Sequence, residues 1–158
     1  MALITLTSDI GSPDYLVGAI KAQLLQLVPN AQIIDISHAI PPFNYPQASY
    51  VCRSAIQHFP SHTFHVILVD LFAKPSDHLI LAFHQNQYFL CANNGLLSMI
   101  LEGTPEMVVG IKLDPTVTKT TLQITEAIGL VIHKIDQGIS LKEVGVQEVD
   151  FVEKKHLQ

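Results

Sequence analysis

The sequence predicts an α/β domain with a mostly parallel sheet sandwiched by helices and a β-hairpin in its second half. Short apolar runs alternate with segments whose apolar residues recur at helical spacing, a pattern typical of α/β sheets. Apolar residues make up 48% of the 158 residues, and mean hydropathy is +0.32, as expected for strands buried on both faces. A chain of this length fits one domain with a single core.

The first predicted element is a strand that starts at residue 3 and stops at Asp9. Its Leu, Ile and Thr residues suit a strand. A tight turn follows at Gly11. A helix is expected to begin at Pro13, with Ser12 as its cap and Asp14 at its N-terminus. Apolar residues at helical spacing extend this helix to residue 28, and a Pro-Asn pair ends it.

The other elements follow from the same patterns. Further strands are expected over residues 31–37, 63–70, 78–83, 87–92 and 107–112. Further helices are expected over residues 47–59, 96–101 and 122–137. Strands 78–83 and 87–92 should form the hairpin around Gln85-Asn86. Residues 1–150 are expected to form the single domain and residues 151–158 a polar tail, with fraying expected from Val149 to Gln158.

Composition narrows the classes of function. The net charge is −5 with no basic stripe, which disfavours a nucleic-acid partner. No run approaches a membrane span and no signal peptide is visible, so we expect no membrane partner. Cys52 and Cys91 form no CxxC pair and are expected to be reduced in a cytoplasmic protein. His58, His62 and His65 straddle a Pro-Ser break, so we expect no metal site.

Polar residues follow three of the predicted strands. They are Asp9, Asp70 and the pair Asn93-Asn94. Because the carboxyl ends of parallel strands share one edge, these residues can converge at a crevice, where a carboxylate could bind a ribose diol. The alternative is that Asp and Asn simply favour turns. His38 is a candidate acid or base, although we favour a loop residue whose ring bonds the backbone.

A series of short motifs runs in order through residues 3 to 100. It comprises Ile4–Gly11, Asp14, Val17-Gly18, Lys21, Pro29–Ala31, Ile34–His38, Ile40–Pro42, Phe59-Pro60, Val69-Asp70 and Asn94–Leu97. This series resembles the N-terminal domain of the S-adenosylmethionine (SAM) hydroxide adenosyltransferases, also called SAM hydrolases. They are relatives of the fluorinating and chlorinating adenosyl enzymes.

The resemblance implies an α/β domain followed by a small β-barrel domain, assembled as a homotrimer. It implies that SAM lies between the N-terminal domain of one subunit and the C-terminal domain of its neighbour. Water then attacks the ribose C5′, methionine leaves and adenosine remains, so SAM is a substrate and no cofactor is implied. The enzyme must position and activate that water. The sequence stops where the β-barrel should begin, so we expect that domain to be absent.

The resemblance also assigns roles to individual residues. It implies that Asp9 holds the ribose hydroxyls and that Asp14 lies near the methionine end. Asp70 matches the aspartate that handles water. The arginine and histidine that accompany this aspartate in the family align with Asp77 and Gln123, so both partners are lost here.

These departures lead to the hypothesis of a degenerate SAM hydrolase that binds SAM or adenosine with weak or no hydrolysis. Asn93 and Asn94 are further substrate-binding candidates, where the Asp-Asn-Gly turn of the family has become Asn-Asn-Gly. One alternative is an active hydrolase in which Lys74 or His38 assists Asp70. Another alternative is a non-enzymatic oligomeric interaction module, which the apolar composition motivates.

Overall fold

A computed structural model describes residues 2–11, 14–73, 79–114, 116, 119–146 and 149–154. These residues form one sheet flanked by helices, which confirms the predicted α/β class. The strands are β1 (Leu3–Ser8), β2 (Gln32–Ser37), β3 (Phe64–Leu68), β4 (Leu79–His84), β5 (Gln87–Ala92) and β6 (Met107–Ile111). The helices are α1 (Leu16–Leu27), α2 (Tyr45–Ile56), α3 (Leu96–Leu101), α4 (Thr121–Asp136) and α5 (Leu141–Val144).

The strand order in the sheet is β2-β1-β3-β5-β4-β6. β1 pairs in parallel with β2 and β3, and β3 pairs in parallel with β5. β4 is antiparallel to both of its neighbours, so it alone among the described strands runs against the others. The prediction of a mostly parallel sheet is therefore confirmed. At the β4–β5 turn, Gln85 and Asn86 have φ values of 48° and 64°, the left-handed pair that a tight hairpin requires.

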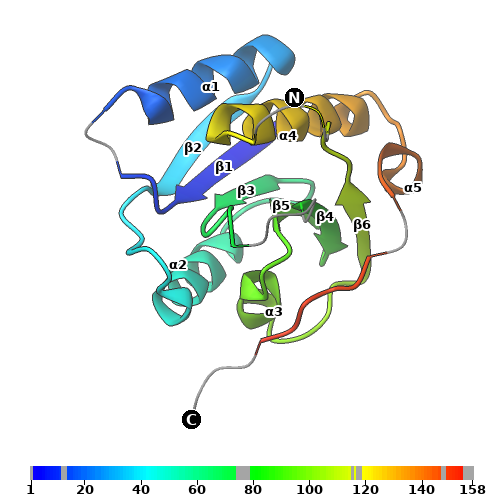
Figure 1. Cartoon of the computed structure of the whole chain (residues 1–158). Coiled ribbons are helices and arrows are strands. Elements are labelled where there is room, and N and C mark those ends of the chain that lie inside the picture. The colour runs from blue at the N-terminus through cyan, green and yellow to red at the C-terminus, as the bar shows by residue number, and fades with distance from the viewer. Residues whose placement is uncertain are drawn as a thin grey trace.

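Helices cover both faces of the sheet (Figure 1). α1 and α4 pack together on one face, and α2 and α3 pack together on the other. In β3, Val66 and Leu68 belong to the core beneath α1 and α4, whereas Ile67 belongs to the core beneath α2 and α3. This alternation explains why the strand is buried at every position and is apolar except at His65, because both of its faces are covered.

The first helix begins later than predicted. α1 starts at Leu16 rather than at Pro13, because the Asp14 Oδ1 atom accepts a hydrogen bond from the Leu16 main-chain N–H at 2.9 Å. Asp14 therefore lies before α1, and its carboxylate accepts from the first N–H of the helix. The predicted cap Ser12 and Pro13 itself lie outside the described residues.

The second helix begins earlier than predicted. α2 starts at Tyr45 rather than at Gln47, because Asn44 acts as its cap and Pro46 occupies its first turn. The Asn44 Oδ1 atom accepts from the Gln47 N–H at 3.1 Å. In the described part of the chain, no helix combines the length and the apolar character that a membrane crossing needs.

The end of the described chain corrects the expectation of a fraying tail. The segment 149–154 passes beside α3 (Figure 1), and two of its apolar side chains join the core there. The Asn93 side chain donates to the carbonyl oxygen of Asp150 at 2.8 Å and accepts from the N–H of Val152 at 2.9 Å. The Ser98 hydroxyl bonds the main chain of Lys154. Residues 155–158 of the predicted tail lie outside the described residues.

Candidate functional site

Three of the residues that follow strands lie together at the carboxyl edge of the sheet. The Asp70 N–H donates to the Asp9 Oδ2 atom at 2.9 Å. The Asn94 side-chain amide donates to the carbonyl oxygens of Val69 at 3.0 Å and of Asp70 at 3.1 Å. The parallel pairing of β1 with β3 and of β3 with β5 brings these positions side by side. Asp9, Asp70 and Asn94 thus form one polar cluster.

The backbone at this edge is shaped to make those contacts. Asp70 has a φ of 51°, in the left-handed region that Asp tolerates better than most residues. This conformation follows β3 directly, and its N–H bonds the Asp9 carboxylate. Gly95 has a φ of 94°, and the Asn94 Oδ1 atom accepts from the Leu96 N–H at 3.0 Å as α3 begins. The strand end and the helix start therefore hold Asn94 against Asp70.

Tyr45 is a member of the cluster that the sequence did not indicate. Its hydroxyl donates to the Asp70 Oδ2 atom at 2.5 Å. Burial raises the pKa of Tyr45, and the hydrogen bond to Asp70 and the charges of Asp70 and Asp9 raise it further. Tyr45 is therefore a neutral phenol that donates to Asp70. The Asn44-Tyr45-Pro46 pattern could have placed Tyr45 at a helix start, but no local signal pairs it with a strand end.

A cation reaches the cluster from the end of the described chain. The Lys154 ammonium lies 4.1 Å from the centre of the Tyr45 ring, which is cation–π geometry. The Lys154 stem crosses Gly95 so closely that a Cβ atom on Gly95 would lie 2.5 Å from the Lys154 Cγ atom. The segment that was expected to fray therefore borders the cluster.

Two candidate substrate-binding residues have other contacts in this structure. The Asn93 amide bonds the main chain of the segment 149–154, as described above. Asp14 is exposed, and its carboxylate bonds the start of α1. No contact between described residues joins Asp14 to Asp9 or Asp70. The role of Asp14 at the methionine end stays a prediction.

Two positions align with the catalytic arginine and histidine of the family, and of these only Gln123 is among the described residues. Gln123 lies at the start of α4, where its Oε1 atom accepts from the Thr120 N–H at 3.1 Å. The Gln123 N–H donates to the Thr120 hydroxyl at 3.2 Å, which completes a capping box. The Thr-x-x-Gln spacing was the sequence signal for this box. Asp77 and Lys74 lie outside the described residues.

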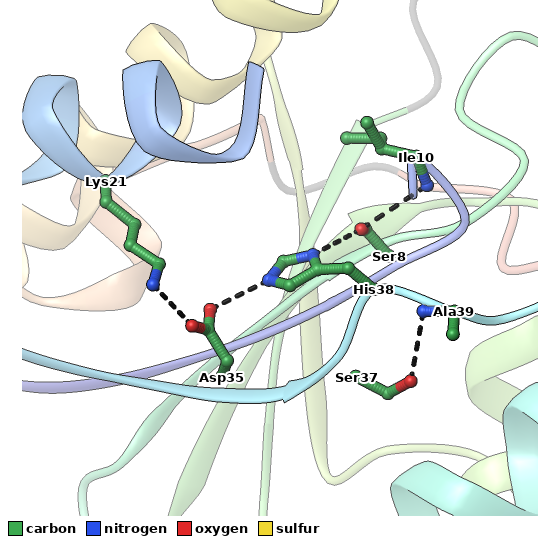
Figure 2. Close-up of polar contacts among 7 residues, drawn as sticks. All are labelled: Ser8, Ile10, Lys21, Asp35, Ser37, His38 and Ala39. Carbon is green, nitrogen blue, oxygen red and sulfur yellow. Dashed lines mark hydrogen bonds and ion pairs between the residues drawn. The ribbon is translucent and has the colours of Figure 1, made fainter. Parts of the chain in front are cut away.

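His38 is held by side chains, which corrects the favoured interpretation that its ring bonds the backbone (Figure 2). Its Nδ1 atom lies 2.5 Å from the Ser8 hydroxyl, and its Nε2 atom lies 2.8 Å from the Asp35 Oδ1 atom. Lys21 donates to the other oxygen of Asp35. Burial acts to raise the pKa of Asp35, but the hydrogen bonds with Lys21 and His38 and the positive charge of Lys21 outweigh it, so the pKa is lowered.

The cluster offers acceptors to a ligand. Among the described residues, the Oδ1 atoms of Asp9 and Asp70 accept no hydrogen bond, and both side chains are partly exposed. A carboxylate oxygen of this kind can accept a hydroxyl hydrogen. Metal-ligating side chains do not gather in groups of three or more within the described ranges. In α/β domains, ligands commonly bind at the edge where parallel strands end, and the cluster lies at this edge.

The family follows from comparison with known proteins. A sequence model described as the SAM hydroxide adenosyltransferase N-terminal domain matches residues 4–145. The chain therefore belongs to this family, which confirms the resemblance seen in the sequence.

Individual relatives agree with the family. The chain is 34% identical over 105 residues to an (R)-S-adenosyl-L-methionine hydrolase of Methanocaldococcus jannaschii, covering 63% of this chain and 40% of that protein. It is 30% identical over 94 residues to a protein of the same name from Salinispora arenicola, covering 60% of this chain and 36% of that protein. These alignments span at most 40% of the length of either curated relative.

A solved structure supports the fold. The crystal structure of an uncharacterized conserved protein from Thermotoga maritima superposes with a TM-score of 0.82 at 26% identity. The match covers 99% of this chain and 61% of that protein. The α/β arrangement described here is therefore shared along nearly the whole length of this chain.

Proposed function

We propose that this domain binds SAM or adenosine at the carboxyl edge of its sheet, and that it hydrolyses SAM weakly or not at all. The observation that carries the proposal is the Asp9 carboxylate, which is held beside Asp70 with one oxygen open to a ligand. A ribose presents two neighbouring hydroxyls, and a carboxylate can accept both hydrogens. Membership of the family supports SAM as the source of that ribose.

The surroundings of the cluster also fit a nucleoside. Phe43, in the loop before α2, is 76% exposed, and Phe72, in the loop after β3, is 53% exposed. Both loops meet the same edge as Asp9 and Asp70, because β2 and β3 end there. Aromatic faces of this kind stack on bases with a stabilisation of about 1–3 kcal/mol. Charged and apolar groups of a nucleoside site are thus both present on one edge.

Weak or absent hydrolysis is proposed because the groups that should assist Asp70 are replaced. One oxygen of Asp70 accepts from a neutral phenol, Tyr45, rather than from a cationic side chain. Gln123, at the position where the family has a histidine, is a capping residue and has no imidazole to move a proton. Asp77 places a carboxylate where the family has an arginine. Water activation by Asp70 would therefore lack both partners.

The proposal includes self-association, which the family resemblance implies as a trimer. Tyr15, Phe43 and Phe72 are large exposed apolar side chains, and a second copy would cover them. Sedimentation velocity of the purified chain tests this part. A trimer or another oligomer supports it, and a monomer at all concentrations contradicts it.

Calorimetry with adenosine and with SAM, followed by chromatography of the SAM mixture, tests the main proposal. Both ligands should bind, and no adenosine should form at rates typical of enzymes. Asp9→Asn should weaken binding by on the order of ten- to a hundredfold, since it removes charge-assisted hydrogen bonds. Asp136→Asn, an exposed carboxylate at the end of α4, is the matched control and should bind as wild type does.

Each part of the proposal has its own contradicting result. Absence of binding by both ligands contradicts the nucleoside site. Rapid release of adenosine from SAM contradicts the loss of hydrolysis, and favours the active enzyme with Asp70 as its base. If that turnover survives Asp70→Ala, Asp70 is not the group that handles water.

A further inference from the structure

A chain of four side chains leads from the surface to the turn that carries Asp9 (Figure 2). Lys21 on α1 donates to Asp35 on β2, and the other Asp35 oxygen lies 2.8 Å from the His38 Nε2 atom. The His38 Nδ1 atom lies 2.5 Å from the Ser8 hydroxyl, and that hydroxyl accepts from the Ile10 N–H at 3.4 Å. The chain therefore bonds the residues on both sides of Asp9.

The donors and acceptors in this chain fix one direction. An ionised carboxylate only accepts, so in the neutral ring the Nε2 atom of His38 carries the hydrogen that Asp35 accepts. The Nδ1 atom then has a lone pair and accepts the hydroxyl hydrogen of Ser8. With its hydrogen committed to His38, the Ser8 oxygen presents its lone pairs to the Ile10 N–H. Asp35 thus sets the orientation of a hydroxyl two contacts away.

Ser8 is not the reacting group of this arrangement. Its side chain is 0% exposed, and the hydroxyl lies between the imidazole and the main chain of the turn. A nucleophile needs a substrate atom within reach, and no such approach exists at a fully buried hydroxyl. The chain of hydrogen bonds therefore acts on the turn rather than on a ligand.

The β1–β2 pairing explains why the turn needs this support. The parallel register of β1 and β2 shifts between Leu6 and Thr7, so the regular ladder is interrupted just before the turn. Beyond the shift, His38 holds the turn twice: its carbonyl oxygen accepts from the Gly11 N–H at 2.9 Å, and its ring bonds Ser8. One main-chain and one side-chain hydrogen bond of His38 thus connect the ends of β1 and β2 where their ladder is irregular.

We propose that His38 is a positioning residue for Asp9, acting through Ser8 and oriented by Asp35. Its ring keeps the turn in the conformation in which the Asp9 carboxylate accepts from the Asp70 N–H and faces the ligand. The effect on ligand binding rests on the proposed function. The effect on the Asp9 carboxylate itself does not, because it is measurable in the ligand-free protein.

Three substitutions separate the two bonds of the ring. His38→Asn keeps an acceptor near the Nδ1 position for Ser8, His38→Gln keeps a donor near the Nε2 position for Asp35, and His38→Ala keeps neither. If His38 acts through Ser8, His38→Asn should retain adenosine affinity within about threefold, while the other two lose about tenfold. Thermal unfolding of each variant checks that the domain still folds.

A double-mutant cycle with Asp9 tests the route of the effect. His38→Gln should cost about tenfold in adenosine affinity in the wild type and less than about twofold in Asp9→Asn, because the residue to be positioned is already altered. An equal loss in both backgrounds overturns the proposal, since it means general damage. Wild-type affinity of His38→Gln overturns it as well.

Nuclear magnetic resonance of the ligand-free protein provides the independent test. The ¹⁵N signals of His38 should show a protonated Nε2 atom and an unprotonated Nδ1 atom. The ¹³C shift of the Asp9 carboxylate should change in His38→Gln and remain near its wild-type value in His38→Asn. The opposite tautomer overturns the positioning role. An Asp9 carboxylate ¹³C shift that stays at its wild-type value in both variants overturns it as well. If these shifts behave as stated while adenosine fails to bind, the proposed function falls and the positioning of Asp9 stands.

Discussion

Two histidines contact hydroxyls of β1 through the same ring atom, in two different regions of the molecule. The His65 Nδ1 atom lies 2.7 Å from the Thr5 hydroxyl in the middle of the sheet, where His65 is 2% exposed. The His38 Nδ1 atom lies 2.5 Å from the Ser8 hydroxyl at the carboxyl edge. His38 has Asp35 on its other nitrogen, whereas His65 lies between aromatic rings.

The difference shows that a hydroxyl–imidazole pair has no fixed role. Burial lowers the pKa of His65 to about 4, so it is a neutral member of the core at neutral pH. At the edge, the Asp35 carboxylate lies 2.8 Å from the His38 Nε2 atom and gives that ring a fixed direction of hydrogen bonding. The first histidine should therefore affect stability, and the second should affect the geometry of the Asp9 turn.

The largest expected effect is the loss of stability in acid that His65 causes. Its pKa in the folded state, about 4, lies below the value of 6.5 for an exposed histidine. As the pH falls from 6.5 to 4, the unfolded chain gains a proton that the folded chain does not. The free energy of unfolding should therefore fall with pH, by roughly 3 kcal/mol over that window.

Urea unfolding at pH 7, 5.5 and 4 measures this slope. His65→Gln cannot titrate, so it should be less stable than the wild type at pH 7 but lose less on acidification. If the wild type and His65→Gln show the same dependence between pH 7 and 4, His65 is not the neutral core residue described here.

The next effect separates the adjacent amides Asn94 and Asn93. Asn94 is 5% exposed and bonds two carbonyl oxygens and one N–H in the cluster. Asn94→Ala should cost about 2–3 kcal/mol, because these buried groups lose their partner. Asn93→Ala should cost about 1 kcal/mol and release the segment 149–154. Urea unfolding gives the two costs, and limited proteolysis should detect the released segment only in Asn93→Ala.

A smaller effect on stability, with a separate effect on binding, is expected from Asp35→Asn. Asp35 is partly exposed, so losing its ion pair with Lys21 should cost less than about 1 kcal/mol of stability. It should nevertheless reduce adenosine affinity about threefold, because the His38 tautomer is no longer fixed. Lys21→Met is the matched control, since it keeps the Asp35 oxygen that His38 needs. Equal affinities of the two variants would remove the link between Asp35 and the turn.

The smallest effect concerns Lys154. Lys154→Met keeps the stem over Gly95 and removes the charge over the Tyr45 ring. The free energy of unfolding should fall by about 0.5–1 kcal/mol, as for cation–π pairs at exposed sites. Lys134→Met on α4 serves as the comparison and should leave stability near the wild-type value. A loss of stability in Lys134→Met as large as in Lys154→Met would contradict a specific contact with Tyr45.

The sequence predicted most of the elements, because their signals are local. The apolar run that becomes β3 and the turn at Gln85-Asn86 need no knowledge of distant residues. The start of α1 was placed too early, since Asp14 lies before the helix and its carboxylate accepts from the Leu16 N–H. The segment 149–154 looked like a fraying tail, because its partner Asn93 is more than fifty residues away.

The candidate site was only partly predictable for the same reason. That Asp9 and Asp70 meet follows from the rule that parallel strands end at one edge, and this needs no side-chain detail. Tyr45 donates to Asp70 from the start of a helix that the sequence placed two residues later. The spacing of three between Asp35 and His38 was a usable signal, but the contact with Ser8 depends on the pairing of β1 with β2.

Comparison of adenosine with 2′,3′-dideoxyadenosine by calorimetry tests most directly whether Asp9 binds a ribose. The two ligands share the base and differ in the hydroxyls that the carboxylate should accept. The wild type should bind adenosine at least about tenfold more tightly, and Asp9→Asn should lose most of this preference. Equal affinities in the wild type, or a preference that Asp9→Asn leaves unchanged, would contradict a ribose-binding role for Asp9.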